Sequence, residues 1–205
     1  ASDVYKRQVF TSGGSESINL AIRGTAAALA GSDRRHIVAS TIEHEAVQQT
    51  VKALSKQGWT TTLVGVDGTG IVEPDRLASA LTDETALVSI MHANNEIGTV
   101  QPIAELAALT HARGAIFHTD AVQSVGKIPV DVDKLDVDLL SLSGHKFNGP
   151  KGTGALWIRR GSRLQSLITG GKQERNRRAG TENVPAIIGL GAAAQIALED
   201  GVARA

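Results

Sequence analysis

Residues 137–148 read VDLLSLSGHKFN, in which the mostly apolar run 137–142 is followed at once by small and polar residues. A short run of this kind is typical of a strand that is buried on both faces of a parallel sheet. Residues 86–91 and 115–119 repeat the pattern. Further strands are predicted at 9–11, 36–40, 60–66 and 155–159. The chain is therefore expected to contain a sheet made largely of buried strands.

Longer segments with a helical period separate these strands. Apolar residues recur three and four positions apart in 18–29 and 43–56, and further helices are predicted at 74–81, 102–113 and 185–199. Ser15 or Ser17 is expected to cap the first of them. Strands that alternate with helices predict an α/β fold: a mostly parallel, seven-stranded sheet flanked by helices.

The composition excludes several classes of protein. The chain has 205 residues, no net charge and no cysteine. A neutral chain has no field that draws it to nucleic acid or to a membrane surface, and neither partner is expected. Without cysteine it can supply no disulfide and no thiol nucleophile. No apolar run reaches the ~18 residues of a membrane span, and no signal peptide is recognised, so a cytoplasmic location is expected.

Polar residues follow five of the predicted strands, at the point where each strand ends. In an open α/β sheet, ligands bind beyond the carboxyl ends of the strands, so these residues are the first candidates for a site. In chain order they are Gly14, Ser15, Glu43, His44, Asn95, Asp120, Gln123, Ser143, His145 and Lys146.

Three of these features fit one cofactor. The glycines before Ser15 open a helix whose free N–H groups suit a phosphate, although a simple tight turn explains them equally well. Lys146 follows a strand, where burial is expected to lower the pKa of its amine and make it an imine former. Asp120 also ends a strand, and a buried carboxylate requires a cation or strong donors. Together they match the needs of pyridoxal 5'-phosphate (PLP): a phosphate cradle, a partner for the ring nitrogen and an amine for the aldehyde.

Several long blocks carry a family resemblance. SGGSESINLAIRG (12–24), HTDAVQSVGKIPVD (118–131), SGHKFNGPKGTGAL (143–156) and GGKQERNRRAGTENV (170–184) stand in one order along the chain. In these blocks the sequence resembles the cysteine desulfurases of the NifS and IscS type. That family lies within the class V aminotransferase branch of the fold-type I PLP enzymes. The resemblance extends over nearly all of residues 9–200.

The resemblance implies roles for individual residues. Lys146 would bind the cofactor aldehyde, Asp120 would hold the ring nitrogen protonated, and His44 would stack on the ring and help to move protons. The other contacts that it implies are Asn95 and Gln123 beside the ring, Gly14, Ser15, Ser143 and His145 at the phosphate, and Thr181 at the phosphate of the other subunit of a homodimer. No metal site is implied.

The resemblance also implies an activity and its limits. The family converts L-cysteine to L-alanine and passes sulfur, as a persulfide, to iron–sulfur scaffold proteins or thiolation acceptors. Its members continue into a smaller domain that carries the nucleophilic cysteine. Residues 9–205 are therefore expected to form an incomplete PLP-binding domain that is inactive by itself, and residues 1–8 a non-native or disordered start. Lys172 and Asn176 replace glycines of the family pattern and are expected to disturb their loop.

Two other enzyme functions, and a non-catalytic role as a dimerisation scaffold, stay open at this point. A selenocysteine lyase or an aminotransferase of the same class would share the catalytic residues. A metal-dependent hydrolase would use a set of histidines with one aspartate, although no known ligand spacing supports it; the set is His44, His92, His118, His145 and Asp120. The acidic residues Asp131, Asp133, Asp136 and Asp138 are expected to be exposed.

Overall fold

The computed structural model describes residues 7–204, and seven strands in it form one sheet in the order β1-β7-β6-β5-β4-β2-β3. Strands β2 to β6 are parallel to their neighbours within that group, whereas β7 runs antiparallel to both β1 and β6. This confirms the α/β class and the mostly parallel sheet. The strands are β1 (Gln8–Thr11), β2 (His36–Ser40), β3 (Thr60–Val64), β4 (Thr85–Ser89), β5 (Ile116–Asp120), β6 (Leu139–Ser143) and β7 (Gly154–Ile158).

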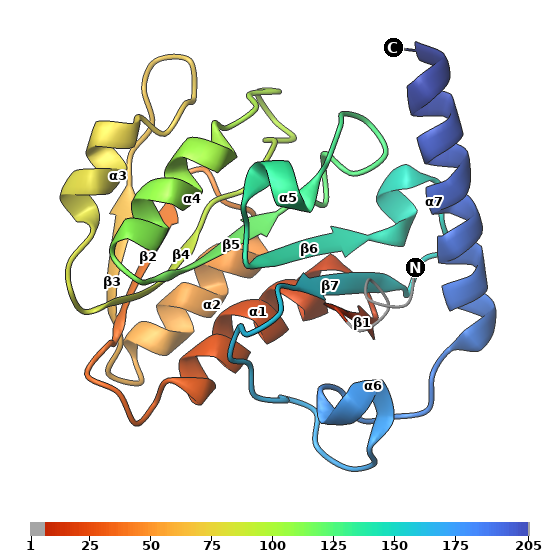
Figure 1. Cartoon of the computed structure of the whole chain (residues 1–205), viewed down its shortest axis with the longest axis horizontal. Helices are drawn as coiled ribbons and strands as arrows, with labels where there is room; N and C mark the ends of the chain where they lie inside the picture. Colours follow the sequence, from red (N-terminus) through yellow and green to blue (C-terminus); the bar gives the residue numbers. More distant parts are fainter. Residues whose placement is uncertain (1–6, 205) are drawn as a thin grey trace.

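Helices cover both faces of the sheet (Figure 1). One face packs against α1 (Gly14–Ala28) and α2 (Glu45–Ser55), and the other against α3 (Pro74–Ala80) and α4 (Ile103–Ala112). The long helix α7 (Val184–Arg204) stands at the side of the sheet. Three short helices were not predicted from the sequence: α5 (Val132–Leu135), the 3-10 helix η2 (Gly144–Phe147) and α6 (Gln173–Asn176).

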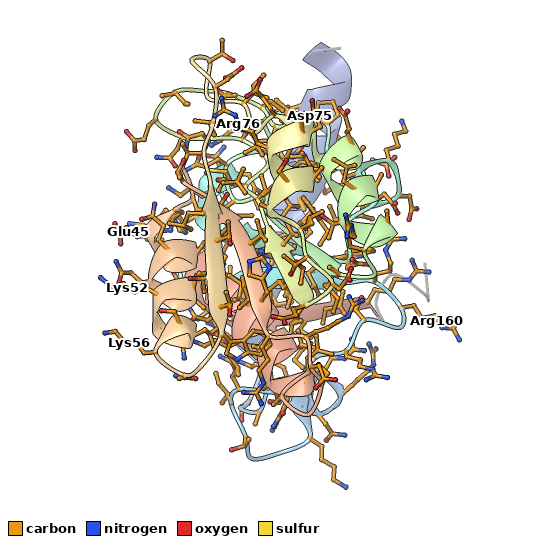
Figure 2. The ribbon with its side chains drawn as sticks, turned by 90° about the vertical axis from the view of Figure 1, so that its left-hand side faces the viewer. Glu45, Lys52, Lys56, Asp75, Arg76 and Arg160 are labelled. Atoms are coloured by element: carbon orange, nitrogen blue, oxygen red, sulfur yellow. The ribbon has the colours of Figure 1, made fainter. Side chains whose placement is uncertain are left out.

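The sheet is buried because its central strands are apolar on both faces. In β2, Ile37 and Ala39 pack towards α1 and α2, while Val38 packs towards α3 and α4. Helix α2 presents Val47 and Val51 to the sheet, one turn apart. Each such side chain contributes about 1.5–3 kcal/mol by leaving water. Figure 2 shows the charged side chains of α2 and α3 pointing outward, among them Glu45, Lys52, Lys56, Asp75 and Arg76.

The two ends of the chain are held differently. Gln8 begins β1 and pairs with Trp157, so the part of the predicted irregular start that the structure describes includes a strand residue. Residues 1–6 of that segment lie outside the described residues. At the other end, α7 packs on η2 through Leu190, Ala193 and Phe147. In residues 7–204 no helix is both long enough and apolar enough to cross a membrane.

Candidate active site

The ends of six strands meet at one edge of the sheet, here called the C-terminal edge. Strands β2 to β6 run in parallel, and β1 runs the same way because both it and β6 are antiparallel to β7. The segments that follow these strands therefore lie along one side of the molecule. They include all but one of the predicted site residues, the exception being Thr181.

The predicted phosphate residues line one cavity at this edge. Helix α1 has Gly13 at its N-cap, with φ 150° and no side-chain cap, so the expected capping by Ser15 or Ser17 is wrong. The N–H groups of its first turn remain free to bind an anion. The cavity has a volume of about 350 Å³. The residues that line it are Ser12, Gly13, Gly14, Ser15, Glu16, Ser143, His145, Lys151 and Gly152.

Close packing holds this cavity in shape. A Cβ added to Gly14 would lie 2.8 Å from Cγ2 of Val122, so a larger residue would push α1 away from the end of β5. Ser143 is buried, and its Oγ lies 3.0 Å from Nδ1 of His145. The hydroxyl, the imidazole and the helix N-terminus form a donor set that suits a phosphate.

Asp120 is a buried carboxylate at the end of β5. It is 4% exposed, and its Oδ1 accepts a hydrogen bond of 2.9 Å from the backbone N–H of Val122. Burial raises the pKa of Asp120, while that hydrogen bond and the charges of His44 and Lys146 lower it in part. Neither of these two side chains is in hydrogen-bond contact with it. A protonated ring nitrogen would supply the missing donor, so this residue fits the pyridine of PLP.

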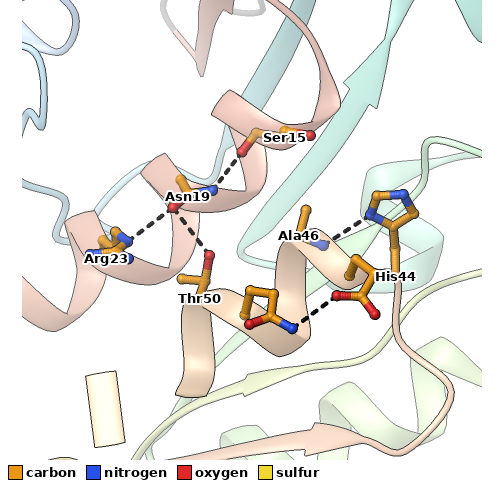
Figure 3. Close-up of a pocket in the computed structure, with 8 residues that line it drawn as sticks. Ser15, Asn19, Arg23, His44, Ala46 and Thr50 are labelled. Atoms are coloured by element: carbon orange, nitrogen blue, oxygen red, sulfur yellow. Dashed lines mark hydrogen bonds between the residues drawn. The ribbon is translucent and has the colours of Figure 1, made fainter. Parts of the chain in front are cut away.

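His44 is the N-cap of α2, and its imidazole is exposed. Figure 3 shows its Nδ1 accepting a hydrogen bond from the backbone N–H of Ala46, at 3.0 Å. A nitrogen that accepts cannot carry a proton, so the neutral ring is protonated at Nε2. The bond also fixes the ring direction. A second cavity, of about 370 Å³, lies between this histidine and α1 and includes Ser15 and Arg23 in its lining.

Lys146 differs from its prediction in one respect. It lies in η2, directly after β6, on the same edge as Asp120, as expected. However, its side chain is exposed, so the predicted burial of the amine is wrong. The physical reason is that the turn of η2 buries Gly144 and Phe147 and leaves the two residues between them facing outward.

The remaining predicted residues are less closely gathered. Asn95 is exposed and donates to Oε1 of Glu96, whereas Gln123 is partly buried and accepts a hydrogen bond of 2.7 Å from Nζ of Lys127. That bond uses the amide oxygen of Gln123 and leaves its NH₂ group free to donate. Thr181 is exposed in the loop between α6 and α7.

The loop that contains Lys172 and Asn176, the two residues that replace glycines of the family pattern, has backbone conformations that L-residues rarely adopt. Asn176 has φ 63°, and Glu174 and Arg175, at 46° and 57°, are also left-handed. Lys172 has φ −91° and carries no such strain. Of the two replaced glycines, only the one at Asn176 occupies a position where glycine would be favoured.

Two features of the edge were given no role in the sequence analysis. Glu43, next to His44, is buried, and its place three positions beyond a buried strand was the local signal that could have indicated a role. Glu16 forms a bidentate ion pair with Arg178, with Nε to Oε1 at 2.9 Å, which ties α1 to the loop before α7. No local pattern indicates that pair, since its members lie far apart in sequence.

The metal-site alternative finds no geometric support in residues 7–204. No group of three or more His, Asp or Glu side chains there is placed to hold a metal ion. His118 lies inside β5, with its ring nitrogens 2.8 and 2.9 Å from the hydroxyls of Ser89 and Ser141. Burial lowers the pKa of His118 to about 3, so it is a neutral core residue.

Comparison with known proteins defines the class. The family model described as aminotransferase class-V matches residues 3–205, and the chain belongs to that family. The fold and the gathered residues at the C-terminal edge agree with this assignment.

Individual relatives and solved structures show which members of the family the chain is similar to. The chain is 56% identical over 189 residues to the cysteine desulfurase IscS of Methanosarcina thermophila, and 55% identical over 190 residues to that of Dictyoglomus turgidum. These matches cover 92% and 93% of the chain but 46% and 48% of the relatives, so the chain spans about half their length. A solved NifS-like protein matches with a TM-score of 0.93 and 43% identity, over 96% of this chain and 54% of that one. A structure described as SspA in complex with cysteine gives 0.89 and 42%, over 95% and 57%.

Proposed function

We propose that this chain forms the PLP-binding part of a cysteine desulfurase, which converts L-cysteine to L-alanine and transfers the sulfur to an acceptor protein. The observation that carries the proposal is the buried carboxylate of Asp120, which lacks a contacting cation but lies within the electrostatic reach of His44 and Lys146. The named relatives support the reaction, and the SspA structure supports cysteine as the substrate. The sulfur acceptor would be an iron–sulfur scaffold or thiolation protein.

The residues of the C-terminal edge would have separate roles in binding the cofactor. When bound, PLP supplies an aldehyde that takes up amines and a ring that withdraws electrons. Lys146 would hold the aldehyde carbon through Nζ, and its exposure leaves that amine open to displacement by the substrate. Asp120 would keep the ring nitrogen protonated, because a buried carboxylate strongly favours a cationic partner.

The neighbouring groups would orient the ring and exchange protons. His44 would stack on the ring, its plane fixed by the bond to Ala46, and its Nε2 would be the nitrogen that gives or takes a proton. The free NH₂ of Gln123 would donate to the phenolic oxygen, and Asn95 would lie near the substrate. The phosphate would occupy the cavity beside α1, which includes Gly14, Ser15, Ser143 and His145. In a homodimer, Thr181 would contact the phosphate of the other subunit.

The chain contains no cysteine, so it cannot supply the thiol that would carry the persulfide. We therefore expect this chain to bind PLP without releasing sulfur from L-cysteine. In the same scheme, residues 9–205 form the large domain of the enzyme.

Trapping with borohydride tests the cofactor assignment. The chain would be incubated with PLP, reduced with borohydride and digested, and the labelled peptide would be identified by mass spectrometry. We expect the label on Lys146, and its loss together with the visible absorbance in Lys146→Ala. Lys134→Ala is the matched control, since that lysine is exposed and lies at the other edge of the sheet. Label on another lysine, or sulfide release from L-cysteine by this chain, would contradict the proposal.

A further inference from the structure

Glu43 joins the ends of two neighbouring strands, β2 and β4, at the C-terminal edge. It is 4% exposed and immediately precedes His44. Its Oε1 accepts a hydrogen bond of 2.5 Å from Oγ of Ser40, which ends β2, and one of 2.8 Å from the backbone N–H of Met91, beyond β4. One carboxyl oxygen thus connects the turn that carries His44 to the segment that leads to Asn95.

The second carboxyl oxygen is unusual. Oε2 of Glu43 is buried and has no hydrogen-bond partner. An ionised carboxylate in that state would be costly, since a buried charge requires pairing. Burial accordingly raises the pKa of Glu43 to about 8, against the lowering effect of its two hydrogen bonds, and the charge of Asp120 raises it further. At neutral pH this side chain is a carboxylic acid.

The charged groups around Glu43 act unequally on the two acids. The basic side chains of His44 and Lys146 lower the pKa of Asp120 electrostatically, whereas no basic side chain lowers that of Glu43. His92, which follows Met91, offers no charge either, because burial lowers its pKa. Two neighbouring carboxyl groups in such unequal surroundings ionise one at a time.

We propose that Glu43 is a positioning residue of the PLP site: through the two hydrogen bonds of its Oε1 it fixes the turn before His44 to the segment that follows β4. The inference rests on the proposed function, and it gives that function a residue that does not touch the cofactor. Its effect would pass through the placement of His44 and through the ionisation of Asp120.

Three substitutions separate this role from a merely structural one. Glu43→Gln keeps an acceptor oxygen and a neutral group of the same shape, so its PLP affinity at pH 7 should remain within about threefold of the wild-type chain. Glu43→Ala removes both hydrogen bonds, and the added cost of ordering the turn should weaken binding by about tenfold. Glu43→Asp is shorter and should resemble Glu43→Ala. Affinity is measured by the absorbance of bound PLP, under conditions where circular dichroism shows each variant folded.

The pH dependence of unfolding of the cofactor-free chain provides an independent readout. The unfolded chain loses the proton of Glu43 near pH 4.5, whereas the folded chain keeps it up to about pH 8. Between these values the wild-type folding constant should therefore fall by about tenfold per pH unit relative to that of Glu43→Gln. Asp138→Asn, a partly buried acid at the opposite edge, is the control for destabilisation without loss of PLP affinity.

Each result has a defined meaning. Loss of affinity in Glu43→Ala, its retention in Glu43→Gln and the pH step together support the proposal. Wild-type affinity in folded Glu43→Ala, equal losses in the Gln and Ala variants, or the absence of the pH step would overturn it. If the wild-type chain binds no PLP, the proposed function and this inference fail together. If it binds PLP and the Glu43 variants bind equally well, only this inference fails.

Discussion

The acidic residues at the two edges of the sheet differ in whether they form ion pairs. At the N-terminal edge, Asp138 accepts hydrogen bonds from Nε2 of His111 and the backbone N–H of Phe117, each at 2.8 Å, and lies 3.3 Å from Nε of Arg159. Arg159 also binds Asp136, with Nη2 to Oδ1 at 2.7 Å. The expectation of exposure is therefore wrong for Asp138, whose side chain is 13% exposed, whereas the side chain of Asp136 is paired but 47% exposed.

At the C-terminal edge, two buried acids lack such partners, although Glu16 in the first turn of α1 pairs with Arg178. Asp120 and Glu43 are buried without an ion pair, and the basic side chains of His44 and Lys146 are exposed. Removing one partner of a partly buried ion pair destabilises a fold, whereas buried acids without partners have shifted pKa values, which are typical of binding sites. We interpret the N-terminal edge as the one that stabilises the fold and the C-terminal edge as the proposed binding site.

The largest effect is expected from a substitution at the N-terminal edge, where the acidic residues form ion pairs. Asp138→Asn removes the charge that holds His111 and Arg159, and a hydrogen bond to a charged group contributes about 1.5–3 kcal/mol. We expect the free energy of unfolding at pH 7 to fall by about 2–3 kcal/mol, measured by urea denaturation, with PLP affinity unchanged. A variant as stable as the wild-type chain would remove the contrast between the edges.

The same chemical change at the C-terminal edge should have the opposite sign. Because burial raises the pKa of Asp120, its ionised form destabilises the folded chain at pH values above the ordinary 3.8. Asp120→Asn should therefore increase the free energy of unfolding at pH 7 by about 1 kcal/mol, while it weakens PLP binding. The gain should shrink as the pH is lowered towards 3.8. Urea denaturation at pH 7 and pH 4 measures this, and a loss of stability at pH 7 would contradict it.

The smallest effect concerns the loop before α7. Asn176→Gly should raise the free energy of unfolding by about 0.5 kcal/mol, because glycine adopts φ 63° without the strain of a side chain. Lys172→Gly is the matched control: at φ −91° a glycine relieves nothing and only loosens the unfolded chain, so it should be slightly destabilising. Equal shifts of the melting temperature in both variants would show that this strain does not limit the loop.

The sequence predicted the C-terminal edge well because its signal is local. An apolar strand followed by glycine, histidine and lysine at 144–146 can be read within ten residues, and the alternation with helices indicates the parallel sheet. The chemistry of the residues then suggested the roles of Asp120 and Lys146, and the family resemblance added the role of His44; all three are proposals.

What the sequence could not predict depends on contacts between distant segments. The reversed direction of β7 leaves no trace in a five-residue apolar run. The tether from Glu43 to Met91 and the network of Asp138 with His111 each join separate elements. The exposure of Lys146 depends on which residues of η2 turn inward, a choice set by packing against α7.

The pairing of β1 with β7 has a consequence during synthesis. Trp157 is synthesised roughly 150 residues after Gln8, and β1 has no neighbouring strand until then. At ribosomal speeds of about 5–20 residues per second, that delay is about 7–30 seconds. During this time β1 has no partner strand, so its backbone N–H and C=O groups are open to pairing with another chain until β7, which begins at Gly154, has been synthesised.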